Sequence, residues 1–430
     1  MRVGVLGATG LIGSAVVARL LADGHQVLGW ARSTAVAGRS QPAASWQAID
    51  MSRLTAAEDW NCHLVGLDAV VNCAGLLQDA PGESVEAVHA RAVAALALAC
   101  ERSGVRRVIQ VSAIGLDAGT PTAFSRTKHV GDTALMARDL EWVVLRPSVV
   151  VGRRAYGGSA LFRALATLPI LPVVKETGPL DIVALDDVAA TVAFFLPPGA
   201  TGRVVLDLAG PQHLSFADVI RLYRAWLGWP EARMMGVSAT VAGFVFRLGD
   251  AAGLLGWRPP VRSTILREIR RGAAGDPRQW QEMTGIALQS LTAALSAEPA
   301  GVQERWFAVL YLLKPVVLAT LSLFWIATGL ISLGPAASAG ETLLQEAGTG
   351  ALALPLALAG ALADLAIGLG IAWRRTARLA LAGGVVLSIL YALSATALVP
   401  RLWLDPLGPL VKIVPIVVLH LQALATLRDR

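Results

Sequence analysis

The sequence predicts an α/β protein in which a doubly wound parallel sheet is followed by a helical connector and a four-helix transmembrane bundle. Three observations predict this order: a glycine-rich turn directly after the first apolar run, apolar runs that alternate with helical patterns, and four long apolar stretches near the end. Alternating strands and helices form parallel sheets, and about 20 consecutive apolar residues cross a bilayer. The predicted domains are residues 1–235, 236–304 and 305–430.

The first element is the strand Val3–Leu6, which runs into Gly7-Ala8-Thr9-Gly10-Leu11-Ile12-Gly13 and the helix Ser14–Ala22. Gly7 permits a tight turn, Gly10 lets the backbone approach a pyrophosphate, and Gly13 lets the helix pack closely on the strand. The helix N-terminus then points its N–H groups at the phosphates. The sequence therefore predicts a dinucleotide site, which also includes Thr9, Leu11 and Ile12.

Further strands and helices alternate along the first half. The predicted strands are Gln26–Trp30, Ala69–Asn72, Val108–Ser112, Trp142–Arg146 and Val204–Leu208, and the predicted helices include Ser84–Ser103 and Lys128–Arg138. The connector has amphipathic stretches at Val241–Leu255, Val261–Arg271 and Gln279–Ala294, which we expect near the bilayer. Its arginines Arg262, Arg267, Arg270 and Arg271 either contact anionic headgroups or form an ordinary solvated face.

The last third predicts a membrane domain. Its spans are Trp306–Leu333, Gly350–Trp373, Thr376–Val399 and Leu407–Leu427. Arginines mark the ends expected in the cytoplasm: Arg305, Arg374, Arg375, Arg378, Arg428 and Arg430. No cleavable signal peptide is expected before the first strand. The predicted location is a bacterial-type inner (cytoplasmic) membrane, with the N-terminal domain and the C-terminus in the cytoplasm.

Charge and cysteine content limit the partners. Arginines at a membrane surface account for the net charge of +6, so the lipid bilayer is the expected partner and nucleic acid is not. Cys62, Cys73 and Cys100 are odd in number and lack metal-ligand spacing. They fit a reducing compartment, and no metal site is predicted.

The ordered motifs resemble a known family. They are the glycine motif, Asp50, Val71-Asn72-Cys73-Ala74-Gly75, Val111-Ser112-Ala113, Leu145-Arg146-Pro147-Ser148 and Asp186-Asp187-Val188-Ala189. Over residues 1–235 the chain resembles atypical short-chain dehydrogenases/reductases of the NAD-dependent epimerase/dehydratase type, especially NmrA-like redox sensors and the nucleotide-binding accessory subunit of mitochondrial complex I. Arg305-Trp306-Phe307, Leu312-Leu313-Lys314-Pro315 and the segment 403–410 are similar to DoxX-like membrane proteins with four spans.

The resemblance implies roles for individual residues. Arg32 stands at the tip of the second strand, where a cation pairs with a 2′-phosphate, so NADP(H) is favoured over NAD(H). A solvated arginine is the simpler alternative. Asp50 and Met51 are expected at the adenine, and Ala74 with Gly75 at the adenosine ribose. Further cofactor contacts are expected from Pro147 and Val149 at the nicotinamide and from Lys128 at the ribose.

The catalytic set of the family is incomplete here. It consists of a serine and Tyr-x-x-x-Lys, in which the tyrosine exchanges a proton with the substrate oxygen. Ser112 and Lys128 are present, but Phe124 stands where the tyrosine is expected. This argues against a standard ketoreductase, and it leaves open a proton donor elsewhere, such as Tyr156 or Thr122.

The membrane domain contains ionisable residues that are costly in lipid. Counted from the predicted cytoplasmic boundaries, Lys314, Asp364 and His420 all lie roughly 12–14 Å deep. We therefore expect Asp364 to pair with Lys314 and His420 to lie nearby. Polar contacts between helices and a proton or quinone site are both compatible with this arrangement.

Three functions remain open at this stage. The first is an NAD(P)-dependent oxidoreductase, or an epimerase-like enzyme, acting on an apolar, quinone-like or membrane-associated substrate. The second is a catalytically silent cofactor-binding module, either a redox sensor or an assembly or stability factor of a membrane complex. The third is an activity in the four spans that the nucleotide domain regulates. Phe124 favours the second, whereas Ser112 and Lys128 favour the first.

Overall fold

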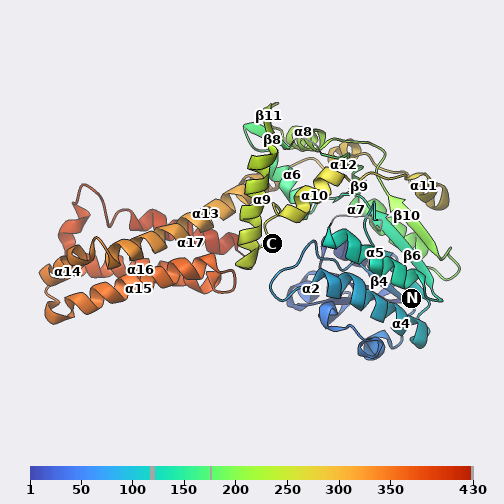
Figure 1. Cartoon of the computed structure of the whole chain (residues 1–430), viewed down its shortest axis with the longest axis horizontal. Helices are drawn as coiled ribbons and strands as arrows, with labels where there is room; N and C mark the ends of the chain where they lie inside the picture. Colours follow the sequence, from blue (N-terminus) through green and yellow to red (C-terminus); the bar gives the residue numbers. More distant parts are fainter. Residues whose placement is uncertain (117–121, 175–176, 428–430) are drawn as a thin grey trace. The chain divides into compact units, whose positions relative to one another are not determined.

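The computed structural model describes residues 1–116, 122–174 and 177–427, and it divides into two compact units (Figure 1). The first unit comprises residues 1–250 and 260–308, and the second comprises residues 251–259 and those from 309 onward. Most of the predicted connector, 236–304, is therefore part of the first unit. Arg428 and Arg430, used above for the orientation, lie outside the described residues.

The first unit is built on a seven-stranded parallel sheet with the strand order β10-β6-β5-β4-β1-β2-β3. Its strands are β1 (Arg2–Leu6), β2 (Gln26–Ala31), β3 (Ser45–Ala48), β4 (Ala69–Asn72), β5 (Arg107–Val111), β6 (Glu141–Pro147) and β10 (Val204–Leu208). The order reverses between β1 and β4, which creates the crevice where such sheets bind ligands. The predicted doubly wound parallel sheet is confirmed.

Helices cover both faces of this sheet. Val16 of α1 (Leu11–Ala22) and Val188 of α7 (Leu185–Phe195) share one apolar core with Val3 and Val5 of β1. On the other face, Leu96 of α4 (Ala92–Ser103) and α5 (Ala123–Met136) share a core with β4 and β5. Strands buried on both faces consist of continuous apolar runs, and this is why the sequence revealed them.

Smaller elements complete the first unit. They are α2 (Ala35–Ser40), η1 (Met51–Arg53), η2 (Ala57–Trp60), α3 (Asn61–Leu64), η3 (Ala87–Arg91), β7 (Val150–Val151), α6 (Gly157–Leu165), β8 (Ile170–Val174), β9 (Val183–Ala184), α8 (Phe216–Trp226), β11 (Arg233–Val237) and most of α9 (Ala239–Leu254). β7 pairs with β9 and β8 pairs with β11, both in parallel. These short pairs lie outside the main sheet.

The segment after α9 folds back onto the sheet unit as α10 (Ser263–Arg271), α11 (Arg278–Thr284) and α12 (Leu291–Ala297). Trp280 of α11 is fully buried in the core of the sheet, and its indole N–H donates to Thr191 Oγ1 at 2.9 Å. The Gln289 amide also donates to Asp187 at 3.2 Å. An amphipathic pattern shows that a helix buries one face, and here that face is buried against protein.

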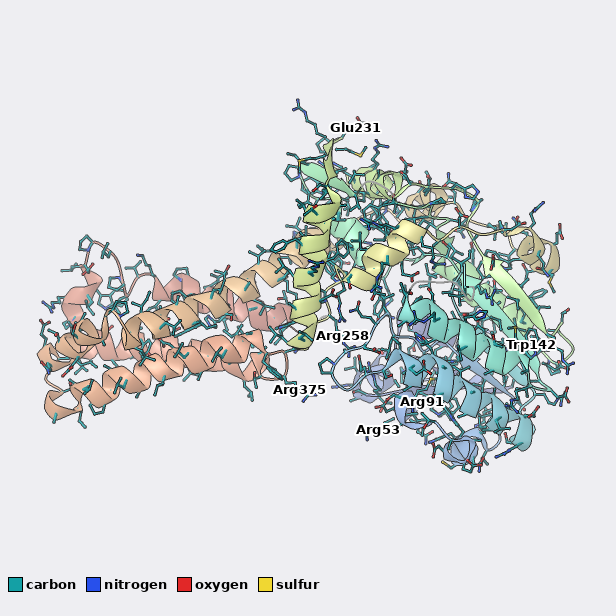
Figure 2. All side chains as sticks on the ribbon, viewed as in Figure 1. Arg53, Arg91, Trp142, Glu231, Arg258 and Arg375 are labelled. Carbon is teal, nitrogen blue, oxygen red and sulfur yellow. The ribbon has the colours of Figure 1, made fainter. Side chains whose placement is uncertain are left out.

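The second unit contains most of α13 (Val302–Leu333), with α14 (Ala337–Glu346), η4 (Gly350–Leu352), α15 (Ala353–Ala372), α16 (Ala377–Leu398), η5 (Pro400–Trp403) and α17 (Ile413–Thr426). Within the described residues, three helices are long and apolar enough to cross a membrane: α13, α15 extended from Gly350, and α16. The fourth predicted span forms the shorter α17, because Pro406, Gly408 and Pro409 keep its first residues in turns. Figure 2 shows Arg375 at the end of the bundle where α15 and α16 join.

The surface of this unit is apolar. Leu379, Val386 and Leu393 recur every seven residues along α16 and expose 78%, 67% and 64% of their area. Residues seven apart lie on one face of a helix, so these side chains form a continuous apolar stripe. A stripe of this kind suits contact with lipid rather than with water.

The packing of α13 against α15 corrects the prediction for Lys314. Ser322 Oγ donates to the Gly368 carbonyl at 2.8 Å, and Gly329 lies against Ala361. These contacts place Asp364 level with Trp325 on α13. Trp325 follows Lys314 by eleven residues, so Asp364 and Lys314 are separated by about 16 Å along the helix axis. The predicted pair of Asp364 with Lys314 is therefore wrong. Depth was counted from Trp306, but α13 begins at Val302 and its first residues belong to the other unit.

Candidate nucleotide-binding site

The glycine turn joins β1 to α1 at the carboxyl edge of the sheet. Gly7 has φ +66°, and a Cβ on it would lie 2.8 Å from the Ala74 backbone. A Cβ on Gly13 would lie 2.2 Å from the Gly7 carbonyl oxygen. Thr9 occupies the turn, Gly10 caps α1, and Leu11 and Ile12 begin the helix. The backbone N–H groups of a first helical turn lack intrahelical partners, so they are available to phosphate oxygens.

The loop after β4 lies beside this turn. The Ala74 amide donates to Asn72 Oδ1 at 3.0 Å, and Asn72 Nδ2 donates to Gln110 on β5 at 2.8 Å. Gly75 faces Lys128, because a Cβ there would lie 3.9 Å from Nζ. The structure thus brings Gly7, Ala74, Gly75 and Lys128 together, as expected for one site.

The residues expected around the adenosine lie at the ends of β2 and β3. Arg32 directly follows β2 and forms an ion pair with Glu83. Asp50 accepts hydrogen bonds from the backbone and the hydroxyl of Ser52, at 3.1 and 2.7 Å, and Met51 is buried. Asp50 therefore shapes the turn after β3, and the pair of Arg32 with Glu83 is a contact that the sequence did not predict.

The two residues expected at the nicotinamide lie near each other in the chain: Pro147 ends β6 and Val149 precedes β7. The Pro147 carbonyl accepts from the Ile114 amide at 3.1 Å, and the Val149 carbonyl accepts from the Val183 amide at 3.1 Å. These bonds hold the segment after β6 between β5 and β9. Tyr156, considered above as a proton donor, caps α6 and exposes 45% of its area.

Ser112 does not present a free hydroxyl to a substrate. Its Oγ donates to Asp132 Oδ2 at 2.6 Å, and Asp132 also lies 3.6 Å from the Arg146 guanidinium. Burial raises the pKa of the Asp132 carboxyl, while the bond from Ser112 opposes that rise. Asp132 follows Lys128 by four residues on α5, and this spacing on one helix face is a signal that could have revealed it.

Lys128 is buried in the same region. Its ammonium donates to the Val111 carbonyl at 3.1 Å, and Phe124 presents its ring at 5.8 Å from Nζ. Burial lowers the pKa of Lys128, and the neighbouring Asp132 opposes this. Burial also raises the pKa of the Cys73 thiol to about 12, so that thiol is neutral at physiological pH. The lysine is placed to donate, but the phenylalanine beside it has no hydroxyl.

His89, which sequence reasoning missed, holds the loop after β4 in place. Its Nε2 accepts from the Leu76 amide at 2.9 Å, and its Nδ1 lies 3.1 Å from Thr127 Oγ1. Because the Thr127 hydroxyl donates to the Ala123 carbonyl at 2.8 Å, Nδ1 carries the proton. Burial first, and then the charge of Lys128, hold the pKa of His89 well below its ordinary value.

Glu268 of α10 closes the N-terminus of α5. The hydroxyls of Thr122 and Ser125 both donate to its Oε1, the latter at 3.0 Å, and Arg271 donates to Oε2 at 2.7 Å. Arg271 also donates to the Gly115 carbonyl at 2.6 Å. Thr122, the other proposed proton donor, is thus engaged by Glu268. Of the connector arginines, Arg271 and Arg262 contact groups of the protein.

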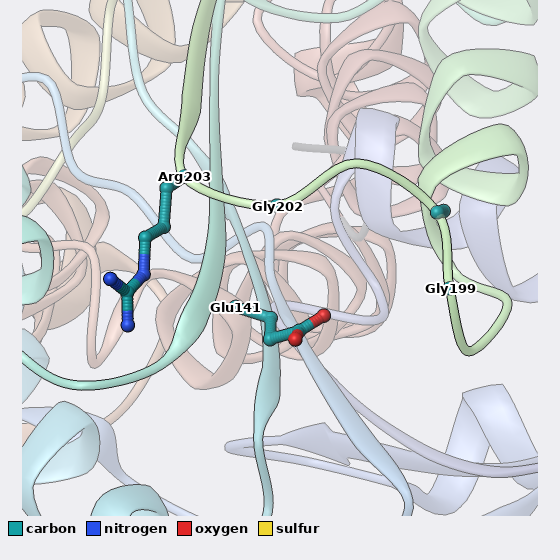
Figure 3. A pocket seen from close by; sticks show the side chains of 5 residues that line it. Glu141, Gly199, Gly202 and Arg203 are labelled. Atoms are coloured by element: carbon teal, nitrogen blue, oxygen red, sulfur yellow. The ribbon is translucent and has the colours of Figure 1, made fainter.

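A cavity of about 220 Å³ lies at the opposite edge of the sheet (Figure 3). It is lined by Glu141, which begins β6, and by the loop from Gly199 to Arg203. The glycine turn lies at the carboxyl ends of the parallel strands, whereas Glu141 lies at an amino end. This cavity is therefore separate from the candidate site.

Inside the second unit, polar side chains pair with one another. The Trp325 indole donates to His420 Nε2 at 2.9 Å, and His420 Nδ1 lies 2.8 Å from the Ile416 carbonyl. The Tyr391 hydroxyl donates to Asp364 Oδ1 at 3.0 Å. Tyr391 and Trp325 are thus the partners of Asp364 and His420, and neither was expected from the sequence.

The sheet order and the glycine turn define the first unit as an NAD(P)-binding domain with the fold of short-chain dehydrogenases and epimerases, attached to a helical membrane domain. Comparison with known families agrees with this. Residues 7–163 match the NAD(P)H-binding family and residues 322–421 match the DoxX-like family. The chain thus combines an NAD(P)H-binding domain with a C-terminal DoxX-like domain, and both predicted resemblances are confirmed.

Two relatives share about a quarter of their aligned residues with this chain. A ceramide reductase of Caulobacter vibrioides is 24% identical, over 51% of this chain and 68% of that protein. The NADH dehydrogenase [ubiquinone] 1 alpha subcomplex subunit 9 of Arabidopsis thaliana is 26% identical, over 53% of this chain and 58% of that protein. The predicted resemblance to a complex I subunit is thereby confirmed.

Solved structures share the fold of the first unit. A nucleoside-diphosphate-sugar epimerase of Staphylococcus aureus superposes with a TM-score of 0.55 at 16% identity, covering 69% of this chain and 99% of that one. The enzyme WbmG of Bordetella bronchiseptica, in complex with NAD, gives 0.53 at 17% identity and covers 69% and 92%. At these identities the similarity shows the fold alone.

Proposed function

We propose that this chain is a membrane-anchored NADP(H)-binding protein of the short-chain dehydrogenase/reductase type that holds its cofactor at the cytoplasmic face of an inner membrane without tyrosine-based proton transfer. The observation that carries this is the contrast within α5. Lys128 is buried with its ammonium directed at the carboxyl edge of the sheet, whereas Phe124 occupies the position of the proton donor. Nucleotide binding is thus supported where standard ketone reduction is not.

The residues that hold the cofactor in this proposal surround the glycine turn. Gly7, Gly10 and Gly13 admit the pyrophosphate, Ala74 and Gly75 approach the ribose, and Arg32 supplies a cation for a 2′-phosphate. The close approach of Gly13 to the Gly7 carbonyl leaves no room for a side chain, which supports a cradle built from backbone. When bound, the cofactor supplies hydride-transfer chemistry.

A titration of the detergent-purified chain with NADPH and NADH, followed by nucleotide fluorescence, tests this proposal. We expect NADPH to bind more tightly, and Arg32→Glu to shift the preference toward NADH by at least about tenfold. Arg102→Glu is the matched control, because Arg102 is another exposed arginine paired with a carboxylate, Glu58 at 2.8 Å. Failure of both nucleotides to bind would overturn the proposal.

A second function, reduction of a lipid-like substrate, is favoured by the relative named ceramide reductase and by the attached membrane unit. It requires a proton source other than Phe124. NADPH oxidation in the presence of a long-chain ketone or decylubiquinone tests it. We expect no turnover by the unmodified chain. Turnover would show that the chain is an enzyme and not a catalytically silent cofactor-binding protein. Phe124→Tyr, which adds a hydroxyl beside Lys128, tests whether the missing group is the limiting one.

A further inference from the structure

The ion pair of Arg32 with Glu83 bears on which nucleotide the site prefers. Glu83 belongs to a tight turn between β4 and η3, which is closed by two backbone hydrogen bonds with Ala80, at 2.8 and 3.2 Å. Gly82 in this turn has φ +82°, a conformation that glycine adopts without strain. The turn therefore fixes the place from which the Glu83 carboxylate reaches Arg32.

The two partners differ in exposure. The Arg32 side chain exposes 44% of its area, whereas that of Glu83 exposes 11%. The carboxylate is thus held within the protein while the guanidinium still faces outward. An arginine can bind a carboxylate or a phosphate with the same planar array of donors, so the two anions compete for it.

We infer that Glu83 is a specificity-determining residue that competes with the 2′-phosphate of NADPH for Arg32 and thereby narrows the preference for NADPH over NADH. This inference rests on the proposed cofactor site. A bound 2′-phosphate displaces the carboxylate or lies beside it, and both arrangements weaken NADPH binding relative to an uncontested arginine. NADH carries a 2′-hydroxyl instead, and a carboxylate accepts a hydrogen bond from such a group.

The test is a titration of the full-length chain in detergent with NADPH and NADH, using Glu83→Gln. This variant keeps the size of the side chain and removes its charge. We expect the ratio of NADPH to NADH affinity to rise by about tenfold, mainly through tighter NADPH binding. Glu58→Gln is the control, because it removes the same charge from an exposed pair, 2.8 Å from Arg102. It should leave the ratio unchanged.

A double-mutant cycle tests whether Glu83 acts through Arg32. In an Arg32→Gln background, Glu83→Gln should no longer change the ratio. An unchanged ratio in the single variant, an equal loss of both affinities, or an effect that persists without Arg32 would each overturn the inference while leaving the cofactor site in place. Failure of the unmodified chain to bind either nucleotide would instead overturn the proposed function itself.

Discussion

The two units use glycine for different purposes. In the nucleotide-binding unit, Gly7 and Gly13 bring backbone against backbone at the turn between β1 and α1. In the membrane unit, Gly368 and Gly384 bring helices together, Gly368 against Ser322 and Gly384 against the ring of His420. The first arrangement shapes the turn of the candidate cofactor site, whereas the second lets helices pack closely. These four glycines all allow a close approach, and their surroundings decide which groups come together.

The units also differ in where apolar side chains lie. The first unit buries Val3, Val5 and Trp280 completely, while α16 of the second exposes Leu379 and Val386. In the second unit the polar side chains of His420 and Asp364 are instead buried within the bundle. The first unit buries apolar side chains, which water solvates poorly, and the second buries polar side chains, which lipid solvates poorly. This difference is the physical basis for assigning the second unit to lipid.

The largest effect is expected at Gly13. A Cβ there meets the Gly7 carbonyl oxygen at 2.2 Å, so Gly13→Val should displace α1 from β1. Affinity for NADPH should fall by more than about 100-fold, equivalent to about 2.7 kcal/mol. A fluorescence titration measures this. Gly158→Val is the control, since nothing lies within 4 Å of a Cβ at Gly158. Equal NADPH affinities in the two variants would contradict the proposal that the glycine turn binds the pyrophosphate.

The corresponding change in the membrane unit is Gly384→Leu. A Cβ at Gly384 would lie 2.4 Å from His420 Nε2, so the larger side chain should break the bond from Trp325 and separate α16 from α17. We expect a loss of roughly 1–3 kcal/mol in the stability of the bundle, measured by thermal unfolding in detergent. The neighbouring Gly383→Leu faces open space and should have little effect. NADPH affinity should not change in either variant, and a parallel loss would show that the units are coupled.

The attachment of α11 to the sheet gives a third comparison. Thr191→Val keeps the shape of the side chain but leaves the buried indole N–H of Trp280 without its acceptor. An unsatisfied buried donor costs about 1–3 kcal/mol. Chemical denaturation of the full chain should show this loss in the nucleotide unit, and Thr284→Val, whose hydroxyl bonds the Trp280 carbonyl, is the control at a half-buried position. A loss no greater than in the control would mean that the indole bond contributes little.

The smallest effect concerns pH. Since the pKa of His89 is lowered in the folded protein, the unfolded chain binds more protons below pH 6.5, and stability falls as pH falls through that value. One such histidine contributes about 0.7 kcal/mol between pH 7 and pH 6. His89→Gln, which offers an amide oxygen to the Leu76 amide but does not bind a proton, should flatten this dependence. His63, whose pKa burial also lowers, should contribute to the slope that remains. An unaltered slope would show that folding does not lower the pKa of His89.

Local sequence predicted the elements that local physics determines. The bounds of β4 and β10 match the predicted strands, because apolar runs between helical patterns show where buried strands lie. The glycine turn was likewise recognisable from its spacing. His89 and Glu83 were not predicted, because their roles depend on contacts with Thr127 and Arg32, which lie far away in the sequence. Asp132 was missed although its spacing from Lys128 on α5 is a local signal.

The errors have a common physical origin. The amphipathic stretch at Gln279–Ala294 indicated a buried face but not what covers it, and the structure places it against the sheet instead of a bilayer. Depths in the membrane were counted from tryptophan and arginine residues, although α13 starts before the apolar region. Periodicity describes one helix at a time. The register between helices depends on small residues such as Gly329 and Gly368, which the count ignored.

The burial of Trp280 has a consequence for how the chain is made. The core of the nucleotide-binding unit needs residues that are synthesised after the whole sheet, and Met283, Ile286 and Leu288 pack against the same core. The first membrane helix, α13, begins at Val302, shortly afterwards. The ribosome therefore presents the first hydrophobic span for insertion almost as soon as this unit can finish folding. Any fragment meant to fold without the membrane must extend through α11 and α12.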